Sequence, residues 1–211
     1  MKVKKHTYNP FRFAGILRPA GWLRNKSLKN LKAKNMKAQE IYFAGGCFWG
    51  TEHFFKQVAG VLETEVGYAN GKEDRSPTYE EVCTDQTGFA ETVRVVFDAD
   101  VCHVKFLTEM YFHAIDPLSL NRQGHDEGTQ YRTGVYYTDD TLLPTLQSVF
   151  REVENSLGQT LAVELLPLRN FFPAEDYHQD YLDKNPQGYC HLPTELFRWA
   201  REQKANKRNK I

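Results

Sequence analysis

The sequence has no apolar run of about 18 residues or more, and no compact apolar segment near its N-terminus. A membrane-spanning helix and a secretory signal each need such a segment, so we expect neither. We therefore expect a soluble protein with no membrane partner, located in the cytoplasm. The 211 residues are 41% hydrophobic, which is enough for one core because domains commonly hold about 100 to 200 residues.

Cysteine is scarce, and its spacing does not match a metal site. Cys47, Cys83, Cys102 and Cys190 lie far apart, without a CxxC pair. Structural zinc sites and disulfide frameworks use closely spaced cysteines, so we expect neither. Reduced thiols in a reducing compartment are the simpler interpretation. We expect no metal and no organic cofactor.

Acidic residues are absent from the first part of the chain. Residues 1–38 contain 11 Lys or Arg and no Asp or Glu, which leaves 16 basic and 27 acidic residues for the remainder. We expect residues 1–38 to form a flexible basic extension and residues 39–211 to form one domain. Because Met36 directly precedes the first strong strand pattern, three interpretations of the extension stay open: a misassigned upstream start, a targeting peptide for an organelle, and a basic surface-binding arm.

Strand patterns alternate with helix patterns along residues 39–211. The apolar period predicts strands at 40–44, 61–68, 90–97, 134–138 and 162–166. It predicts helices from the turn at Cys47 to Val58 and at 104–115, 142–157 and 174–184. In the third strand Thr92 and Arg94 alternate with Val93 and Val95, as expected for a half-buried sheet. The order favours an α+β fold, a two-layer α/β sandwich with a ferredoxin-like core and a mixed sheet. From about residue 185 a mobile C-terminal segment is expected.

Cys47 lies at the predicted turn from the first strand into the first helix. Backbone N–H groups and the helix dipole at such a position stabilise a thiolate, so we expect a reactive Cys47. Gly45 and Gly46 permit a ligand to approach the sulfur closely. Phe48 and Trp49 follow directly, and two such rings can enclose a small apolar group. A second thiol for redox chemistry must come from elsewhere in the chain, because Gly50 stands where a CxxC motif has its second cysteine.

The segment Gly46-Cys47-Phe48-Trp49-Gly50 resembles the signature of the A-type peptide methionine sulfoxide reductases. Further blocks resemble the family in the family's order, at residues 78–83, 87–91, 123–132 and 177–179. The resemblance covers residues from about 39 to about 190. Several ordered blocks over most of a chain are far more specific than one pentapeptide. The resemblance implies that residues 39–211 are a single catalytic domain.

The resemblance also implies a chemical role for four side chains. Cys47 would attack the sulfur of the sulfoxide, and Glu91 would protonate the departing oxygen. Glu91 must then be neutral near neutral pH, which burial against apolar groups would achieve by raising its pKa. Tyr79 and Tyr131 would donate hydrogen bonds to the sulfoxide oxygen.

Substrate binding and enzyme recycling are implied for the remaining family positions. Phe48 and Trp49 would hold the methyl group of the substrate, and Asp126 would orient the site by hydrogen bonding. A sulfenic acid left on Cys47 would condense with Cys190, whose Gly188-Tyr189-Cys190 segment resembles the family's resolving-cysteine block. Thioredoxin is the implied partner that reopens this disulfide.

The chain departs from the family pattern at two points. Relatives often have a histidine where Phe89 precedes Ala90 and Glu91, and some carry a recycling cysteine after the position of Cys190. Nothing after Cys190 is a cysteine here, so we predict a cycle with one resolving thiol. We assign no role to Cys83 or Cys102. A monomer is expected, acting on the S epimer of methionine sulfoxide in oxidised proteins, in peptides or in free form.

Two other functions remain open at this point. A cysteine hydrolase would need a histidine near Cys47, and His53, His113, His125 and His178 are candidates. A nucleic-acid binder would use the basic extension, although the acidic remainder of the chain argues against it, and we expect no nucleic-acid partner.

Overall fold

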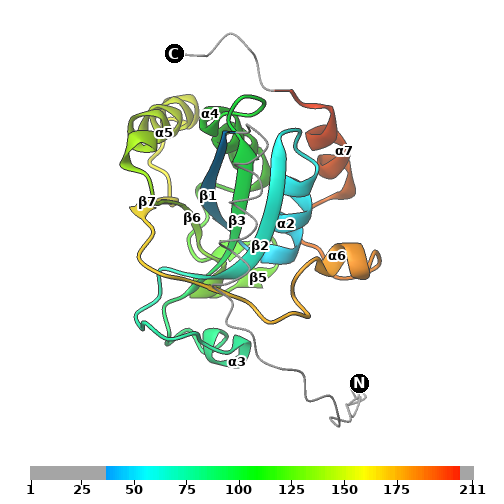
Figure 1. Cartoon of the computed structure of the whole chain (residues 1–211). Helices are drawn as coiled ribbons and strands as arrows, with labels where there is room; N and C mark the ends of the chain where they lie inside the picture. The colour runs from blue at the N-terminus through cyan, green and yellow to red at the C-terminus, as the bar shows by residue number, and fades with distance from the viewer. Residues whose placement is uncertain (1–36, 205–211) are drawn as a thin grey trace.

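The structure, a computed structural model, describes residues 37–204. The interpretations of the basic extension therefore concern residues that lie almost wholly outside the described range. Six strands form one sheet (Figure 1). They are β1 (Ala38–Gly45), β2 (Val61–Ala69), β3 (Ala90–Asp98), β6 (Thr133–Tyr137), β7 (Glu164–Pro167) and β8 (Phe171–Pro173). The short strands β4 (Arg122–Gln123) and β5 (Asp126–Glu127) pair separately.

The order of the strands across the sheet is β7-β6-β1-β3-β2-β8. β6 and β7 run parallel, and every other pair in this sheet is antiparallel. The central order β6-β1-β3-β2, with one helix between β1 and β2 and another between β3 and β6, is the ferredoxin-like arrangement. The predicted α+β class and mixed sheet are confirmed.

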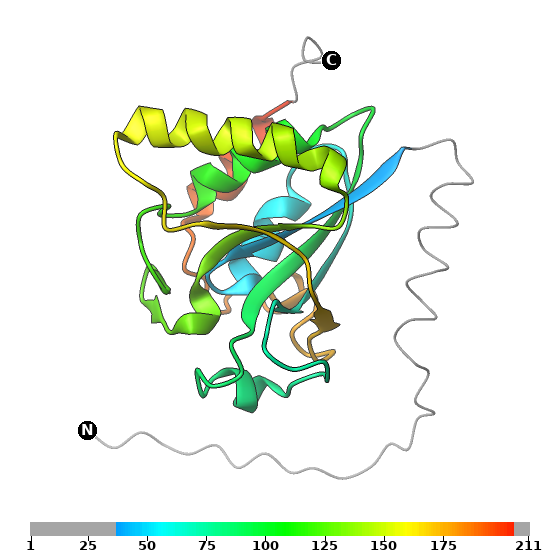
Figure 2. The same ribbon diagram turned by 90° about the vertical axis from the view of Figure 1, so that its left-hand side faces the viewer.

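Within residues 37–204, six α-helices connect or follow the strands. They are α2 (Phe48–Lys56), α3 (Tyr79–Val82), α4 (Val104–Ala114), α5 (Leu143–Leu157), α6 (Tyr181–Lys184) and α7 (Thr194–Glu202). α2 and α4 contact the sheet, and α5 lies across the outside of α4 (Figure 2). Within residues 37–204 no helix is long and apolar enough to cross a membrane.

The core lies between the sheet and the helices α2 and α4. Alternation along β1 directs Ile41 and Phe43 into this layer, where both are fully buried. The Phe43 ring stacks on Phe55 of α2 with a centroid distance of 4.5 Å and on Tyr111 of α4 at 5.0 Å. One strand residue thus joins both helices to the sheet.

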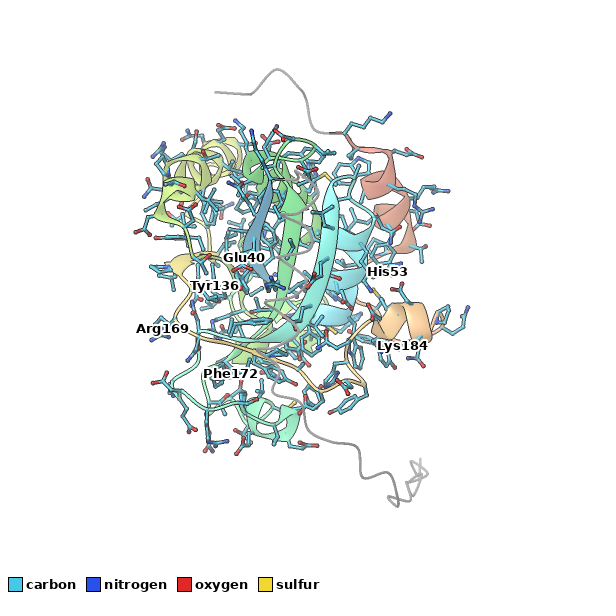
Figure 3. The ribbon with its side chains drawn as sticks, viewed as in Figure 1. Glu40, His53, Tyr136, Arg169, Phe172 and Lys184 are labelled. Carbon is cyan, nitrogen blue, oxygen red and sulfur yellow. The ribbon has the colours of Figure 1, made fainter. Side chains whose placement is uncertain are left out.

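The opposite face of the sheet differs from the sequence-based prediction. Thr92 and Arg94 were expected on a half-exposed face, but both are buried, with Arg94 only 1% exposed. The Arg94 guanidinium tolerates this because it contacts Glu40 at 2.8 Å and Glu63 at 3.2 Å. Glu40 and Tyr136 mark this face in Figure 3. The burial of Arg94 was not predicted because it depends on charge pairing, and the spacing of apolar residues carries no information about charge pairing.

The predicted helix at 174–184 is also shorter than expected. Only Tyr181–Lys184 is helical, and Asp180 just before it has a left-handed backbone with φ of 55°. The Gln179 side chain is bonded to β2, accepting from the Val66 N–H at 2.9 Å and donating to the Val66 carbonyl at 2.8 Å. This bonding to the sheet replaces the first two turns of the expected helix.

We predict that two identical substitutions differ sharply in their effect on stability. Leu107 in α4 is fully buried, whereas Leu120 is 72% exposed. Leu107→Ala should lower the free energy of unfolding by about 2 to 5 kcal/mol through lost burial and a residual cavity. Leu120→Ala should change it by about 0.5 kcal/mol or less. Urea unfolding measures both, and equal effects would contradict the placement of the core.

Candidate active site

Cys47 occupies the N-cap position of α2, directly after β1. The turn depends on Gly46, whose φ of +79° is rarely adopted by residues with a side chain. A Cβ at Gly46 would lie 2.6 Å from the Cβ of Gln123. Gln123 is itself fixed, because its side-chain amide bonds to both the N–H and the carbonyl of Asp116 at 2.8 Å. The sequence Gly45-Gly46-Cys47 therefore sets the position of the thiol.

Glu91 lies next to this helix start. Alternation along β3 turns it toward the helices, paired with Tyr68 of β2, and its side chain is 1% exposed. Its Oε2 accepts a hydrogen bond from the Phe48 N–H at 3.0 Å. Burial raises the pKa of Glu91 to about 8, with the Phe48 N–H lowering it and the charge of Asp126 raising it. Glu91 is therefore mostly neutral at neutral pH and holds a proton that it can donate.

The state of Cys47 differs from the sequence-based expectation. Burial raises the pKa of the Cys47 thiol well above its usual value, and the charges of Glu91 and Asp126 raise it further. Bonds from the N–H groups of Trp49 and Gly50 lower it, but they do not offset these effects. The expectation of a resting thiolate at the helix N-terminus was wrong for this reason. Protonation of Glu91 removes one of the two opposing charges.

Two tyrosines approach Glu91 from separate elements. Tyr79 is the first residue of α3, and its N–H donates to Glu175 Oε1 at 2.9 Å. Tyr131 ends the 3₁₀ helix η1 (Thr129–Tyr131). Burial, and then the charge of Glu91, raises the pKa of each phenol. Both hydroxyls therefore remain protonated and available as donors.

Phe48 and Trp49 form an aromatic wall beside the thiol. The buried Phe48 ring lies 5.0 Å from His178 and 5.9 Å from Tyr68, measured between ring centroids. Trp49 stacks on Tyr181 at 3.7 Å, and its Nε1 donates to His178 Nδ1 at 3.1 Å. The wall is rigid because the indole is held by both a stacking contact and a hydrogen bond.

Cys190 lies in the loop 185–193, which connects α6 to α7 and folds over the start of α2. A Cβ built on Gly50 would lie 3.0 Å from the Cys190 sulfur and 3.1 Å from the His191 ring. The Tyr189 hydroxyl donates to Asp126 Oδ1 at 3.0 Å. Gly50 therefore creates the space in which this loop reaches the site.

The structure brings all the predicted site residues together around Cys47. They are Cys47, Phe48, Trp49, Tyr79, Glu91, Asp126, Tyr131 and Cys190. Sequence reasoning missed Tyr189 and His191, although their adjacency to Cys190 was a signal for both. It also missed Glu175, which accepts from the Tyr68 hydroxyl at 2.8 Å and from the Tyr79 N–H. A lone glutamate on a loop carried no recognisable pattern.

The two remaining thiols lie in different surroundings. Cys102 is fully buried, and burial raises its pKa to about 12. Cys83 is exposed, and burial of part of its surface raises its pKa while the nearby Tyr79 hydroxyl lowers it. Neither thiol contributes to the electrostatics of Cys47.

The histidines considered for a cysteine hydrolase have other contacts. His53 bonds to Asp183 at 3.1 Å, His113 packs on Trp199 at 4.6 Å, and His125 is exposed. His178 uses its Nδ1 to accept from Trp49. None of these contacts involves Cys47, and the histidine whose ring nitrogen lies within 4.8 Å of the Cys47 sulfur is instead His191.

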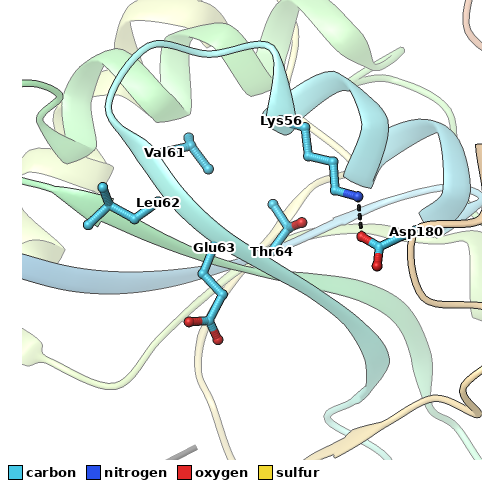
Figure 4. A pocket seen from close by; sticks show the side chains of 6 residues that line it. All are labelled: Lys56, Val61, Leu62, Glu63, Thr64 and Asp180. Atoms are coloured by element: carbon cyan, nitrogen blue, oxygen red, sulfur yellow. Dashed lines mark hydrogen bonds and ion pairs between the residues drawn. The ribbon is translucent and has the colours of Figure 1, made fainter. Parts of the chain in front are cut away.

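A separate groove lies between the last residue of α2, the start of β2 and Asp180, and no cysteine lines it (Figure 4). Lys56 there contacts Asp180, and it donates to Asp183 at 2.6 Å. Glu52 accepts from the Asp180 N–H at 3.0 Å. These bonds attach α6 to α2 and so fix the point from which the loop 185–193 departs.

The arrangement defines a class of protein. A thiol nucleophile, a neutral carboxylic acid and two phenol donors surround one point, and a second thiol lies within the same site. Such a set can reduce an oxygen-bearing group, since the acid and the phenols bind oxygen while the thiols supply electrons. The site is that of a cysteine-dependent oxidoreductase.

Comparison with known proteins identifies the family. Residues 39–210 match the family described as peptide methionine sulfoxide reductase. A peptide methionine sulfoxide reductase MsrA of Clostridium acetobutylicum is 50% identical over 76% of this chain and 98% of its own length. The MsrA of Lachnoclostridium phytofermentans is 49% identical over 72% of this chain and 91% of its own. The chain belongs to the peptide methionine sulfoxide reductase family.

Solved structures agree with this assignment. The reduced form of Mxr1 from Saccharomyces cerevisiae has a TM-score of 0.71 and 39% identity, over 74% of this chain and 92% of its own. Methionine sulfoxide reductase A of Corynebacterium diphtheriae has a TM-score of 0.65 and 35% identity, over 72% of this chain and 77% of its own. The family, the fold and the enzyme class that the motifs predicted are confirmed.

We predict that Glu91 makes the protein less stable as pH rises. Its folded pKa of about 8 exceeds the unfolded value of about 4.3, so its contribution is complete below pH 4.3 and is lost as pH rises through 8. In Glu91→Gln this loss should be missing. Between about pH 5 and pH 9 the free energy of unfolding of the wild type should therefore fall by a few kcal/mol more than that of the variant. Glu195→Gln, which alters an exposed carboxyl, should follow the wild type in urea unfolding.

Proposed function

We propose that this site reduces the S epimer of methionine sulfoxide, in peptides, in oxidised proteins or in free form, with Cys47 as nucleophile and Glu91 as proton donor. The reaction class, thiol-dependent reduction of methionine sulfoxide, follows from the family. The observation that carries the residue roles is the buried, neutral Glu91 carboxyl bonded to the N–H of the residue that follows Cys47. A carboxylic acid kept protonated beside a nucleophile serves as a general acid.

The first step couples the two groups. Cys47 gives up its proton to solvent, and its sulfur attacks the sulfur of the sulfoxide while Glu91 protonates the oxygen. The oxygen, as hydroxyl, then moves from the substrate sulfur to the Cys47 sulfur as the substrate S–O bond and the new S–S bond break, which leaves a sulfenic acid on Cys47 and releases methionine. The neutral form of Glu91 is the one that can donate, and it is also the one that does not repel a Cys47 thiolate. Neutral Glu91 therefore favours both the attack by the Cys47 thiolate and the protonation of the sulfoxide oxygen.

The neighbouring side chains would bind the substrate. Tyr79 and Tyr131 offer protonated hydroxyls to the sulfoxide oxygen, and their raised pKa values support this role. Phe48 and Trp49 form the apolar wall for the methyl group. Asp126 accepts a hydrogen bond from Tyr189 in the loop that carries Cys190, so Asp126 would orient both this loop and the thiol on it.

The second half of the cycle would use Cys190. Its thiol condenses with the Cys47 sulfenic acid, which releases water and forms a disulfide. The loop 185–193 must shift to admit a substrate, since Cys47 is only 6% exposed beneath it. We propose that thioredoxin reduces the disulfide, that no organic cofactor takes part and that the enzyme acts as a monomer in the cytoplasm, where thioredoxin supplies electrons. The chemistry of the cycle supports the first of these assignments, since a dithiol that exchanges with the disulfide returns both thiols to their reduced form.

We predict that the protein reduces only the S epimer of a methionine sulfoxide peptide and that Cys47→Ser abolishes the reaction. In Glu91→Gln the first step should slow about 10²- to 10⁴-fold through loss of the acid. The wild-type rate constant should rise with pH as Cys47 loses its proton and should level off above about pH 8, because Glu91 then loses the proton that it must donate. Rapid-quench single turnovers with resolved epimers measure these quantities. Reduction of the R epimer alone, or an unaltered rate in Glu91→Gln, would refute the proposal.

We predict that Cys190→Ser separates the two halves of the cycle. This variant should form about one methionine per enzyme at the wild-type rate and then stop when thioredoxin is the reductant, because no disulfide forms. The sulfenic acid should be trapped by dimedone and detected by mass spectrometry. Cys102→Ala provides the control, since it removes a buried thiol outside the site and should turn over repeatedly. Repeated turnover by Cys190→Ser with thioredoxin would contradict the assignment.

A further inference from the structure

Three side chains at the site present a combination of donor atoms that the reaction does not explain. The Cys47 sulfur, one carboxylate oxygen of Asp126 and one ring nitrogen of His191 all lie within 4.8 Å of one another. They come from the start of α2, from β5 and from the loop before α7. Thiolate, carboxylate and imidazole are the ligand types that zinc takes in proteins.

Two of these side chains carry buried polar atoms that lack partners. Asp126 Oδ2 and both ring nitrogens of His191 are buried without a hydrogen bond. The Gly45 carbonyl also lies near the His191 ring, but not in the geometry of a normal hydrogen bond. A buried polar atom without a partner costs about 1 to 3 kcal/mol. Several such atoms around one point indicate a site that a bound ion completes.

Gly46 and Gly50 of the cysteine motif leave the space that the His191 ring occupies. A Cβ at Gly46 would lie 3.4 Å from its Nε2, and one at Gly50 would lie 3.1 Å from its Nδ1. Burial lowers the pKa of His191, although Asp126 and Gly45 raise it. A neutral imidazole is the form that binds a metal.

We propose that the reduced enzyme binds one thiophilic divalent cation, of which Zn²⁺ is the natural candidate, through the Cys47 sulfur, an Asp126 oxygen and a His191 nitrogen. A tetrahedral zinc ion holds its ligand atoms about 3.5 Å apart, so modest movements of the three side chains complete the site. Three protein ligands leave a fourth position for water. Binding displaces the Cys47 proton to solvent, so affinity rises with pH.

The bound ion would inhibit the enzyme reversibly. A coordinated Cys47 sulfur cannot attack a sulfoxide, and the ion would keep the loop 185–193 over the site through His191. Oxidation of Cys47 to a sulfenic acid or a disulfide removes the thiolate ligand and releases the metal. Only this inhibition rests on the proposed function. Metal binding itself does not.

Binding is tested with Co²⁺, which replaces zinc and absorbs light when it is bound to a thiolate. Pre-reduced protein, freed of dithiols that would chelate the metal, should bind one Co²⁺ per chain with a thiolate-to-metal charge-transfer band. Cys47→Ser should lose the band, and Asp126→Asn and His191→Asn should each bind more than about tenfold more weakly. His113→Asn removes an exposed histidine outside the site and should bind like the wild type. Far-ultraviolet circular dichroism checks that each variant is folded.

Wild type whose Cys47 thiol has been oxidised, as checked by mass spectrometry, provides a test without mutation, because it has no thiolate ligand and should lose the band. Wild-type affinity in His191→Asn or Asp126→Asn, or cobalt binding by the oxidised protein, would overturn the proposal. Zn²⁺ should stop methionine formation in a single turnover of pre-reduced enzyme, and EDTA should restore it. Binding without this inhibition would overturn the inhibitory role. If the wild type binds cobalt as expected but reduces no sulfoxide, the proposed function fails and the metal site stands.

Discussion

The hydrogen bond from the Phe48 N–H to Glu91 Oε2 joins the start of α2 to the middle of the sheet. It places a buried carboxyl against the residue that follows Cys47, and burial keeps that carboxyl neutral with a pKa of about 8. A charged Glu91 at this point would repel the thiolate that the reaction needs. The acid and the nucleophile that we propose therefore depend on one contact between β3 and α2, and the surrounding fold maintains it.

The same helix also positions the second thiol. Glu52 and Lys56 attach α6 to α2, and Trp49 stacks on Tyr181 of α6. The loop 185–193 leaves from this fixed point, and Gly50 provides the space in which it approaches the thiol. α2 thus has Cys47 at its start and is bonded to α6, from which the loop that contains Cys190 departs. A side chain at position 50 would close this approach, because its Cβ would meet both Cys190 and His191.

Some parts of the fold were predictable because they depend on local patterns. The strand β1, the helices α4 and α5, and the turn at Cys47 follow from apolar periods and paired glycines. Errors arose where polar contacts between distant residues decide the outcome. Arg94 is buried because Glu40 and Glu63 neutralise it. The region before α6 is not helical because Gln179 bonds to β2.

The sequence by itself determined the family and the fold class, and it was sufficient to propose the reacting groups, because ordered motifs and the position of Cys47 after two glycines are local properties. Only the tertiary structure decided their protonation states. The pKa of the Cys47 thiol is raised, contrary to expectation. Burial and two carboxyl groups raise this pKa by more than the N–H groups at the helix N-terminus lower it. Only the tertiary structure also showed that donor atoms of Cys47, Asp126 and His191 lie within 4.8 Å of one another. Burial and the approach of distant side chains are properties of the packed molecule, and no single segment contains them.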